Sequence, residues 1–260
     1  MSDRADNPVT EAVRRADGPA VCAYVTAGYP SRAAFPEILR SAASAADVVE
    51  VGVPFTDPMA DGLTIQRTSR VALGDGATLG WVLDVLEAEG PRLGAPRLLM
   101  GYYNPFLAFG LDRLGEALAA SGASGLIIAD LPLEESGPMR DALGRWGGSL
   151  VQLVAPTTPE TRLGRLAAAS DGFVYAVTVA GVTGGRLRVG DDELEYLRRV
   201  RSASALPVLA GFGVRTAGDV AALAPHVDGV VVGSALLDAI DRGEGPASFI
   251  GGLRATGVPA

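Results

Sequence analysis

The chain has 260 residues, of which 48% are hydrophobic, and this length suits one α/β barrel or two small domains. Its formal net charge is −8 and its basic residues are all arginine, which argues against general binding of nucleic acids or anionic membranes. Because lysine is absent, a Schiff base, covalently held pyridoxal phosphate and a Walker-type phosphate lysine are excluded.

The composition also predicts the compartment. The first residues are polar and have no apolar signal-peptide core. The longest apolar runs, such as 229–237, are much shorter than the ~20 residues of a membrane span. The single cysteine, Cys22, cannot form an internal disulfide. We therefore expect a cytoplasmic protein that does not enter a membrane.

Eight short apolar runs along the chain predict strands. They are rich in Val, Ile and Leu, and most do not alternate with polar residues, which is typical of parallel strands buried on both faces. The predicted strands are 21–25, 48–51, 98–102, 125–128, 150–154, 173–177, 208–210 and 229–232.

Amphipathic segments between these runs predict helices. The expected ranges are 31–46, 65–73, 78–89, 111–120, 135–146, 159–169, 191–204, 216–223 and 235–240. Ser31, Thr78, Asp191 and Thr216 are expected N-caps because their side chains can accept hydrogen bonds from the first turn.

Eight strand–helix units without a linker predict a single (β/α)8 barrel over residues 1–260, with an extra N-terminal helix. An open, doubly wound sheet is the structural alternative. In a barrel, active groups lie at the carboxyl ends of the strands. The candidates at that end are Glu50, Asp61, Asp130, Tyr175, the turn 211–213 and the turn 233–234.

Glu50 is an acid inside an apolar strand, with valines at 48, 49, 51 and 53. Burial of a carboxylate is costly, so we expect a raised pKa that suits Glu50 to donate and accept a proton near neutrality. A structural acid bonded to backbone amides or arginine is the alternative. Asp57 and Asp61 stand in Asp-Pro and Asp-Gly pairs, which are also common in turns.

Two glycine turns, AGFGV at 210–214 and VGSAL at 232–236, match the phosphate site that barrels form after strands seven and eight. The helix that follows Ser234 would direct free amides and its positive dipole end toward an anion. The loop GVTGG at 181–185 could cover the same phosphate. Tight turns alone would explain each glycine pair, but three at one end favour phosphate.

The remaining polar residues give weaker indications of function. Cys22 fits a small core residue, and His226 precedes a strand and therefore lies at the opposite end of the barrel. Asp130 could cap a loop or line the site. No His, Cys and carboxylate cluster has the spacing of metal ligands, so no metal site is predicted.

An ordered set of motifs resembles the tryptophan synthase α-subunit family over almost the whole chain. The motifs are VEVGVPFTDPMADG (49–62), LLMGYYNP (98–105), GLIIADLPLEES (125–136), AGVTGG (180–185), AGFGV (210–214) and VVGSAL (231–236). The resemblance implies reversible retro-aldol cleavage of indole-3-glycerol phosphate to indole and D-glyceraldehyde 3-phosphate. It further implies that Glu50 transfers protons and that Asp61 stabilises the charge at the indole N–H.

The resemblance also implies which residues contact the substrate, its phosphate and a partner subunit. Those near the substrate would be Tyr175, Thr183, Tyr102, Met100, Ala129 and Phe212, and those that hold phosphate would be Gly184, Gly213, Gly233 and Ser234. Asp57, Asn104 and Pro132 match loops that face a β subunit in an α2β2 assembly. Pyridoxal phosphate is then expected only in that β subunit, with no cofactor in this chain.

Two departures from the family pattern keep alternatives open. Leu63 replaces the usual proline after Ala-Asp-Gly, and VTVAGVTGG at 177–185 differs from the commoner serine/arginine form of that loop. Both changes concern coupling to a β subunit, so a standalone indole-3-glycerol-phosphate lyase remains an alternative. A half-barrel sugar-phosphate isomerase would have an acid ending its first strand, which VCAYVTAG lacks. A non-catalytic scaffold is disfavoured because Glu50 and Asp61 are both present.

Overall fold

Eight parallel strands form a closed barrel in chain order, with β1 hydrogen-bonded to both β2 and β8. The computed structural model describes residues 7–177, 190–211 and 213–254. The strands are β1 (Ala20–Thr26), β2 (Val48–Gly52), β3 (Arg97–Gly101), β4 (Gly125–Ile128), β5 (Ser149–Val154), β6 (Val174–Val177), β7 (Val208–Gly211) and β8 (Gly229–Val232). The closed parallel barrel confirms the predicted fold and excludes the open sheet.

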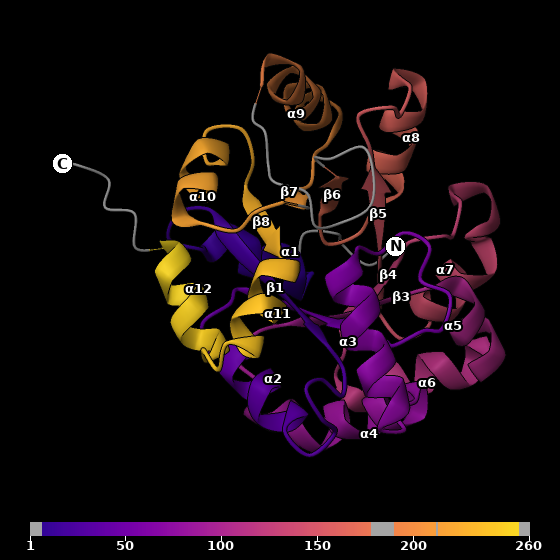
Figure 1. Ribbon diagram of the computed structural model, residues 1–260. Coiled ribbons are helices and arrows are strands. Elements are labelled where there is room, and N and C mark those ends of the chain that lie inside the picture. The colour runs from indigo at the N-terminus through magenta and orange to yellow at the C-terminus, as the bar shows by residue number, and fades with distance from the viewer. Residues whose placement is uncertain (1–6, 178–189, 212, 255–260) are drawn as a thin grey trace.

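Helices surround this barrel (Figure 1). They are α1 (Pro8–Arg15), α2 (Phe35–Ala43), α3 (Leu63–Gly74), α4 (Leu79–Glu89), α5 (Tyr103–Phe109), α6 (Leu111–Ser121), α7 (Gly137–Gly144), α8 (Glu160–Ala169), α9 (Asp191–Ala203), α10 (Ala217–Leu223), α11 (Ser234–Asp241) and α12 (Pro246–Arg254). Two short 3-10 helices, η2 (Gly90–Arg92) and η3 (Leu133–Glu135), lie in the connections. Within the described ranges, none of the helices has both the length and the apolar character needed to cross a bilayer.

The extra N-terminal helix α1 is fixed beneath the barrel. Asn7 caps it by accepting hydrogen bonds from the Val9 and Thr10 amides, and its own Nδ2 donates to the Ser149 hydroxyl at 2.7 Å. The Thr10 hydroxyl donates to the Gly172 carbonyl at 2.7 Å. These contacts attach α1 to the start of β5 and the turn before β6. The opposite, carboxyl end of the barrel is left for the strand-to-helix loops that form the site.

The helix predictions were less accurate than the strand predictions. Helix α2 begins at Phe35 and not at residue 31, because Pro36 lacks an N–H and is tolerated only in the first turn. Ser31 therefore is not its N-cap, whereas Thr78 and Thr216 do cap α4 and α10. Asp191 is the first residue of α9, one position inside the helix. Helices α5 and α12 were missed. That the whole of 1–260 is one domain stays a prediction.

Candidate active site

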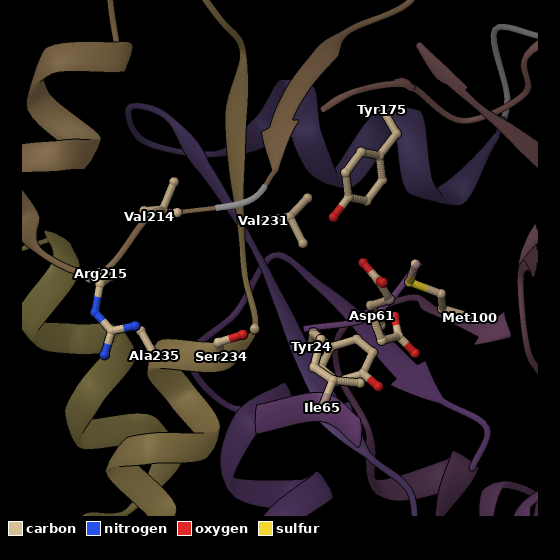
Figure 2. A pocket seen from close by; sticks show the side chains of 13 residues that line it. Tyr24, Asp61, Ile65, Met100, Tyr175, Val214, Arg215, Val231, Ser234 and Ala235 are labelled. Carbon is tan, nitrogen blue, oxygen red and sulfur yellow. The ribbon is translucent and has the colours of Figure 1, made fainter. Parts of the chain in front are cut away.

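A pocket opens at the carboxyl end of the barrel and brings together residues that are far apart in sequence (Figure 2). Its lining comes from β1, β2, β3, β6 and β8, from the turns after β2, β7 and β8, and from the first turns of α3 and α11. The lining residues are Tyr24, Glu50, Asp61, Ile65, Met100, Tyr175, Gly213, Val214, Arg215, Val231, Gly233, Ser234 and Ala235. Both predicted acids and three of the four predicted phosphate residues therefore share one pocket.

Two glycines make room for the tyrosines of this pocket. A Cβ at Gly52 would collide with the ring and hydroxyl of Tyr24, and a Cβ at Gly211 would collide with those of Tyr175. Figure 2 shows the hydroxyl of Tyr175 directed toward the middle of the pocket. Burial raises the pKa of both tyrosine hydroxyls well above 10, so both remain neutral hydrogen-bond donors.

Glu50 lies in the middle of β2, where its Cα is paired with that of Tyr24 in β1. The residue is 1% exposed, and in the described part of the chain its carboxylate accepts a hydrogen bond from the Cys22 thiol, with Sγ 4.0 Å from Oε2. Loss of solvent, together with the negative charge of Asp61, raises the pKa of Glu50 from 4.5 to about 8. The raised pKa expected from the sequence is confirmed, and Glu50 holds its proton at neutral pH.

Asp61 reaches the same pocket from the loop between β2 and α3. Burial raises its pKa from 3.8 to about 6, and a hydrogen bond from the Tyr102 hydroxyl opposes this shift. The Tyr102 hydroxyl also accepts the Ala60 N–H at 2.9 Å, and Gln66 Nε2 donates to the Asp61 carbonyl at 2.8 Å. Tyr102 and Gln66 thus fix both sides of the loop, and Asp61 is largely ionised at pH 7.

The two carboxyl groups therefore differ in protonation at neutral pH. Glu50 is mainly a neutral acid and Asp61 mainly an anion, since their pKa values are about 8 and about 6. Two nearby carboxyl groups with separated pKa values can divide the roles of proton donor and electrostatic stabiliser. This arrangement suits a reaction that needs an acid and a fixed negative charge side by side.

Backbone amides gather at another edge of the pocket. Helix α11 begins at Ser234, after Gly233, and Gly213 adopts φ +91°, a left-handed conformation that glycine favours. Gly213, Gly233 and Ser234 all line the pocket, and Figure 2 shows Ser234 where α11 begins. Free N–H groups at a helix start, beside a glycine turn, can bind a phosphoryl group. The predicted residues Gly184, Thr183 and Phe212 lie outside the described residues.

A second, larger cavity adjoins this pocket and shares Asp61 and Met100 with it. Its volume is about 520 Å³, against about 40 Å³ for the first pocket. Most of its lining is apolar and comes from the ends of β4, β5 and β6, including the predicted residue Ala129. Because Asp61 stands between the two spaces, a ring in the larger cavity would meet a carboxylate at its edge.

The other candidates divide between the two ends of the barrel. Asp57, Asn104 and Pro132 are exposed in the loops and first turn that follow β2, β3 and β4. Asp130 accepts a hydrogen bond from the Tyr103 N–H at 2.7 Å and also lines the larger cavity, so both of its expected roles apply. His226 precedes β8 at the opposite end, as predicted. In the described part of the chain, no group of three His, Cys, Asp or Glu could hold a metal.

Sequence reasoning missed Tyr24, Ile65 and Arg215, whereas Val214, Val231 and Ala235 lie within the motifs at 210–214 and 231–236 without having been singled out. Tyr24 could have been found, because it is a polar side chain near the carboxyl end of the predicted first strand, where active groups of a barrel lie. Arg215 directly follows the predicted phosphate turn, and a positive charge at that place was a signal that it could lie near the phosphate.

Comparison with known proteins decides the family. The sequence model of the tryptophan synthase alpha chain matches residues 11–250. The chain belongs to the tryptophan synthase alpha chain family. The resemblance seen in the sequence motifs is confirmed, and the sugar-phosphate isomerase and scaffold alternatives are not favoured.

Individual members of the family agree with this assignment. The tryptophan synthase alpha chain of Roseiflexus castenholzii is 43% identical over 88% of this chain and 89% of its own length. That of Chloroflexus aurantiacus is 41% identical over 88% and 87%. A chain of Mycobacterium tuberculosis tryptophan synthase superposes with a TM-score of 0.88 at 36% identity, covering 95% of this chain and 96% of its own. A chain of the Pyrococcus furiosus tryptophan synthase a2b2 complex has a TM-score of 0.84 at 32% identity, covering 91% and 98%.

Proposed function

We propose that this chain cleaves indole-3-glycerol phosphate to indole and D-glyceraldehyde 3-phosphate, as the alpha subunit of a tryptophan synthase in tryptophan biosynthesis. The observation that carries the proposal is the pair of carboxyl groups in one pocket, with pKa values of about 8 for Glu50 and about 6 for Asp61. The reaction needs one acid and one anion at neutral pH, and the pair meets both needs.

Glu50 moves the protons. Its carboxyl group donates a proton to C3 of the indole ring, which turns the ring into an electron-accepting iminium. The resulting carboxylate then removes the proton from the hydroxyl on the carbon attached to C3. The bond between that carbon and C3 breaks, its electron pair returns to the ring, and an aldehyde forms. One proton enters the substrate and one leaves, so Glu50 ends the cycle protonated.

Asp61 stabilises the positive charge that protonation creates on the ring nitrogen. Its carboxylate accepts the hydrogen bond of the indole N–H, and the surroundings exclude water because the residue is 9% exposed. A charge interaction of this kind is stronger in a site with few waters than in bulk solvent. Tyr102, which donates to Asp61 and accepts from Ala60, holds the carboxylate in place before the substrate binds.

The two ends of the substrate occupy the two spaces of the site. The phosphoryl group lies at Gly213, Gly233 and Ser234, with Gly184 as a further contact from the loop after β6. The indole ring lies toward the larger apolar cavity, near Met100 and Ala129. Tyr175, Thr183 and Phe212 complete the substrate contacts in this proposal.

A β subunit is the partner of this alpha subunit. Asp57, Asn104 and Pro132 are exposed on neighbouring loops at the mouth of the site, so a partner docked there would face the site that releases indole. The pyridoxal phosphate of tryptophan synthase belongs to that partner in this proposal, and this chain needs no cofactor for the cleavage. The complex works in the cytoplasm.

The test is indole release from indole-3-glycerol phosphate, measured with and without a β subunit. Wild-type protein should release indole, and Glu50→Gln and Asp61→Asn should each lose activity. Glu116→Gln and Asp84→Asn change the same residue types on the exposed outer faces of α6 and α4, so they should match wild type. No release by wild type under either condition would overturn the proposal. Fast release that a β subunit does not change would instead indicate a standalone lyase.

A further inference from the structure

Arg215 lies at the phosphate end of the pocket, directly after the glycine turn that follows β7. It lines the same space as Gly213, Gly233 and Ser234. Figure 2 shows its guanidinium at the edge of the pocket beside Ala235, in the first turn of α11. Its side chain is 37% exposed, so water and small solutes can reach it.

The guanidinium is held in position by Asp238, one turn further along α11. Arg215 Nη2 donates to Asp238 Oδ2 at 2.7 Å, and the Thr64 hydroxyl donates to the other carboxylate oxygen, Oδ1, at 3.3 Å. Thr64 lies in the first turn of α3, three residues after Asp61. The carboxylate is therefore fixed from both sides, and it fixes Arg215 in turn.

The remaining donors of Arg215 are available. A guanidinium has five N–H donors, and in the described ranges the only side-chain acceptor it contacts is Asp238. The other ionisable lining residues, Glu50, Asp61 and two tyrosines, bring no positive charge to the pocket. The chain as a whole has a formal charge of −8. A phosphoryl dianion would therefore meet Arg215 as the one cation in the described lining.

We propose that Arg215 binds the phosphoryl group of the substrate directly, and that Asp238 is the positioning residue that orients it. The inference rests on the proposed function for the identity of the substrate, and it goes beyond the backbone amides of the glycine turns. A guanidinium matches the geometry of two phosphoryl oxygens and remains charged at every relevant pH. It adds a charged contact to a site whose other phosphate ligands are neutral amides and a hydroxyl.

A purely structural role would look different. In that case Arg215 and Asp238 would only connect the β7–α10 turn to α11, and loss of either partner would remove the same ion pair. Arg215→Gln and Asp238→Asn would then weaken phosphate binding equally. If Arg215 touches phosphate, Arg215→Gln weakens phosphate binding far more than Asp238→Asn, which acts only through the orientation of Arg215. In the Asp238→Asn variant the amide oxygen can still accept the hydrogen bond from Arg215. The neutral amide would also no longer compete with phosphate for the guanidinium.

The experiment compares four variants with wild type: R215Q, R215K, D238N and the control R242Q. Arg242 lies just after α11 in an exposed ion pair with Glu244, 3.5 Å long, so R242Q removes the same charge away from the pocket. Inorganic phosphate and indole are titrated separately into the isolated chain by calorimetry. Steady-state cleavage of indole-3-glycerol phosphate gives kcat and KM at low salt and at high salt.

We expect R215Q to raise the KM and the phosphate Kd about tenfold, with kcat within about twofold and indole binding unchanged. R215K should recover part of the loss, and the wild-type KM should rise with salt more steeply than that of R215Q. Wild-type phosphate affinity in R215Q, or equal losses in R215Q and D238N, would overturn the inference. If no protein cleaves the substrate, the proposed function fails, and the phosphate titration still tests Arg215.

Discussion

The thiol of Cys22 lies 4.0 Å from Oε2 of Glu50, and within the described chain it is the one hydrogen-bond donor to that carboxylate. A thiol is a weak donor, so it stabilises the ionised carboxylate less than a hydroxyl or an amide would. Burial then dominates and the pKa of Glu50 stays near 8. Cys22, expected from the sequence to be a small core residue, is buried as expected and also contacts the proposed acid.

Replacement of this thiol by a hydroxyl should lower the pKa of Glu50. In Cys22→Ser the hydroxyl is a stronger hydrogen-bond donor than the thiol and stabilises the ionised carboxylate of Glu50. The pH at which the rate falls on the alkaline side (the alkaline limb of the rate profile) should therefore be lower by about one unit. The limb is measured as kcat/KM for cleavage from mildly acidic to alkaline pH. Cys22→Ala, which has no donor, is the control and should not move it downward. An unchanged limb in the serine variant would show that the thiol does not influence Glu50.

The activity of wild type should follow a bell-shaped pH profile. Cleavage requires ionised Asp61 and protonated Glu50, so the rate should rise as pH passes about 6 and fall as pH passes about 8. Because the groups interact, these values belong to the pair as apparent pKa values. A profile that stays flat across both of these pH values would exclude the assigned roles.

Removal of either carboxyl group should cost most of the activity. We expect Glu50→Gln to reduce kcat by about 10²–10⁴, because the variant cannot transfer the proton. Asp61→Asn should reduce kcat by about 10²–10³, because a neutral amide stabilises the ring cation poorly. Single-turnover measurement of indole formation separates these losses from changes in binding. Near-wild-type rates in Glu50→Gln would contradict the mechanism.

The buried acid should also make stability depend on pH. The folded pKa of Glu50, about 8, lies above the ordinary value of 4.5, so its contribution is full below pH 4.5 and is lost as pH rises through 8. At about pH 9, the free energy of unfolding of Glu50→Gln should therefore be about 3–5 kcal/mol larger than that of wild type. At about pH 5 the two should agree within about 1 kcal/mol. Urea unfolding at both pH values measures the difference, and equal stabilities at the higher pH would refute a high folded pKa.

A methyl group at Gly211 should disturb the site through Tyr175. The new Cβ would collide with the tyrosine ring, so Gly211→Ala should lose about 1–3 kcal/mol of stability and at least about tenfold in kcat/KM. Gly251→Ala is the matched control, because no atom lies within 4 Å of its Cβ position on exposed α12, where alanine favours the helix. Thermal unfolding and cleavage assays compare the two. Wild-type kinetics in Gly211→Ala would show that the position of Tyr175 does not matter.

The strands could be predicted closely because their signal is local. A buried parallel strand is apolar on both faces, so β4 and β8 were predicted with their observed bounds. Helix ends were harder, since the start of α2 depends on where Pro36 fits and α5 begins in an Asn-Pro sequence typical of turns. Helix α12 was missed because its sequence, PASFIGGLR, contains two glycines that weaken the helical signal.

The sequence by itself determined the chemistry that this protein has available. Without lysine, proton transfer falls to carboxylates and tyrosine, and the order of the motifs identifies Glu50, Asp61 and the phosphate turns. Only the tertiary structure decided how these groups act together. Pairing of neighbouring strands places Tyr24 beside Glu50 and brings Arg215 and Ser234 into one pocket, and burial separates the pKa values of the two acids. Side-chain type is encoded locally, whereas desolvation and charge interactions depend on which distant segments surround a group.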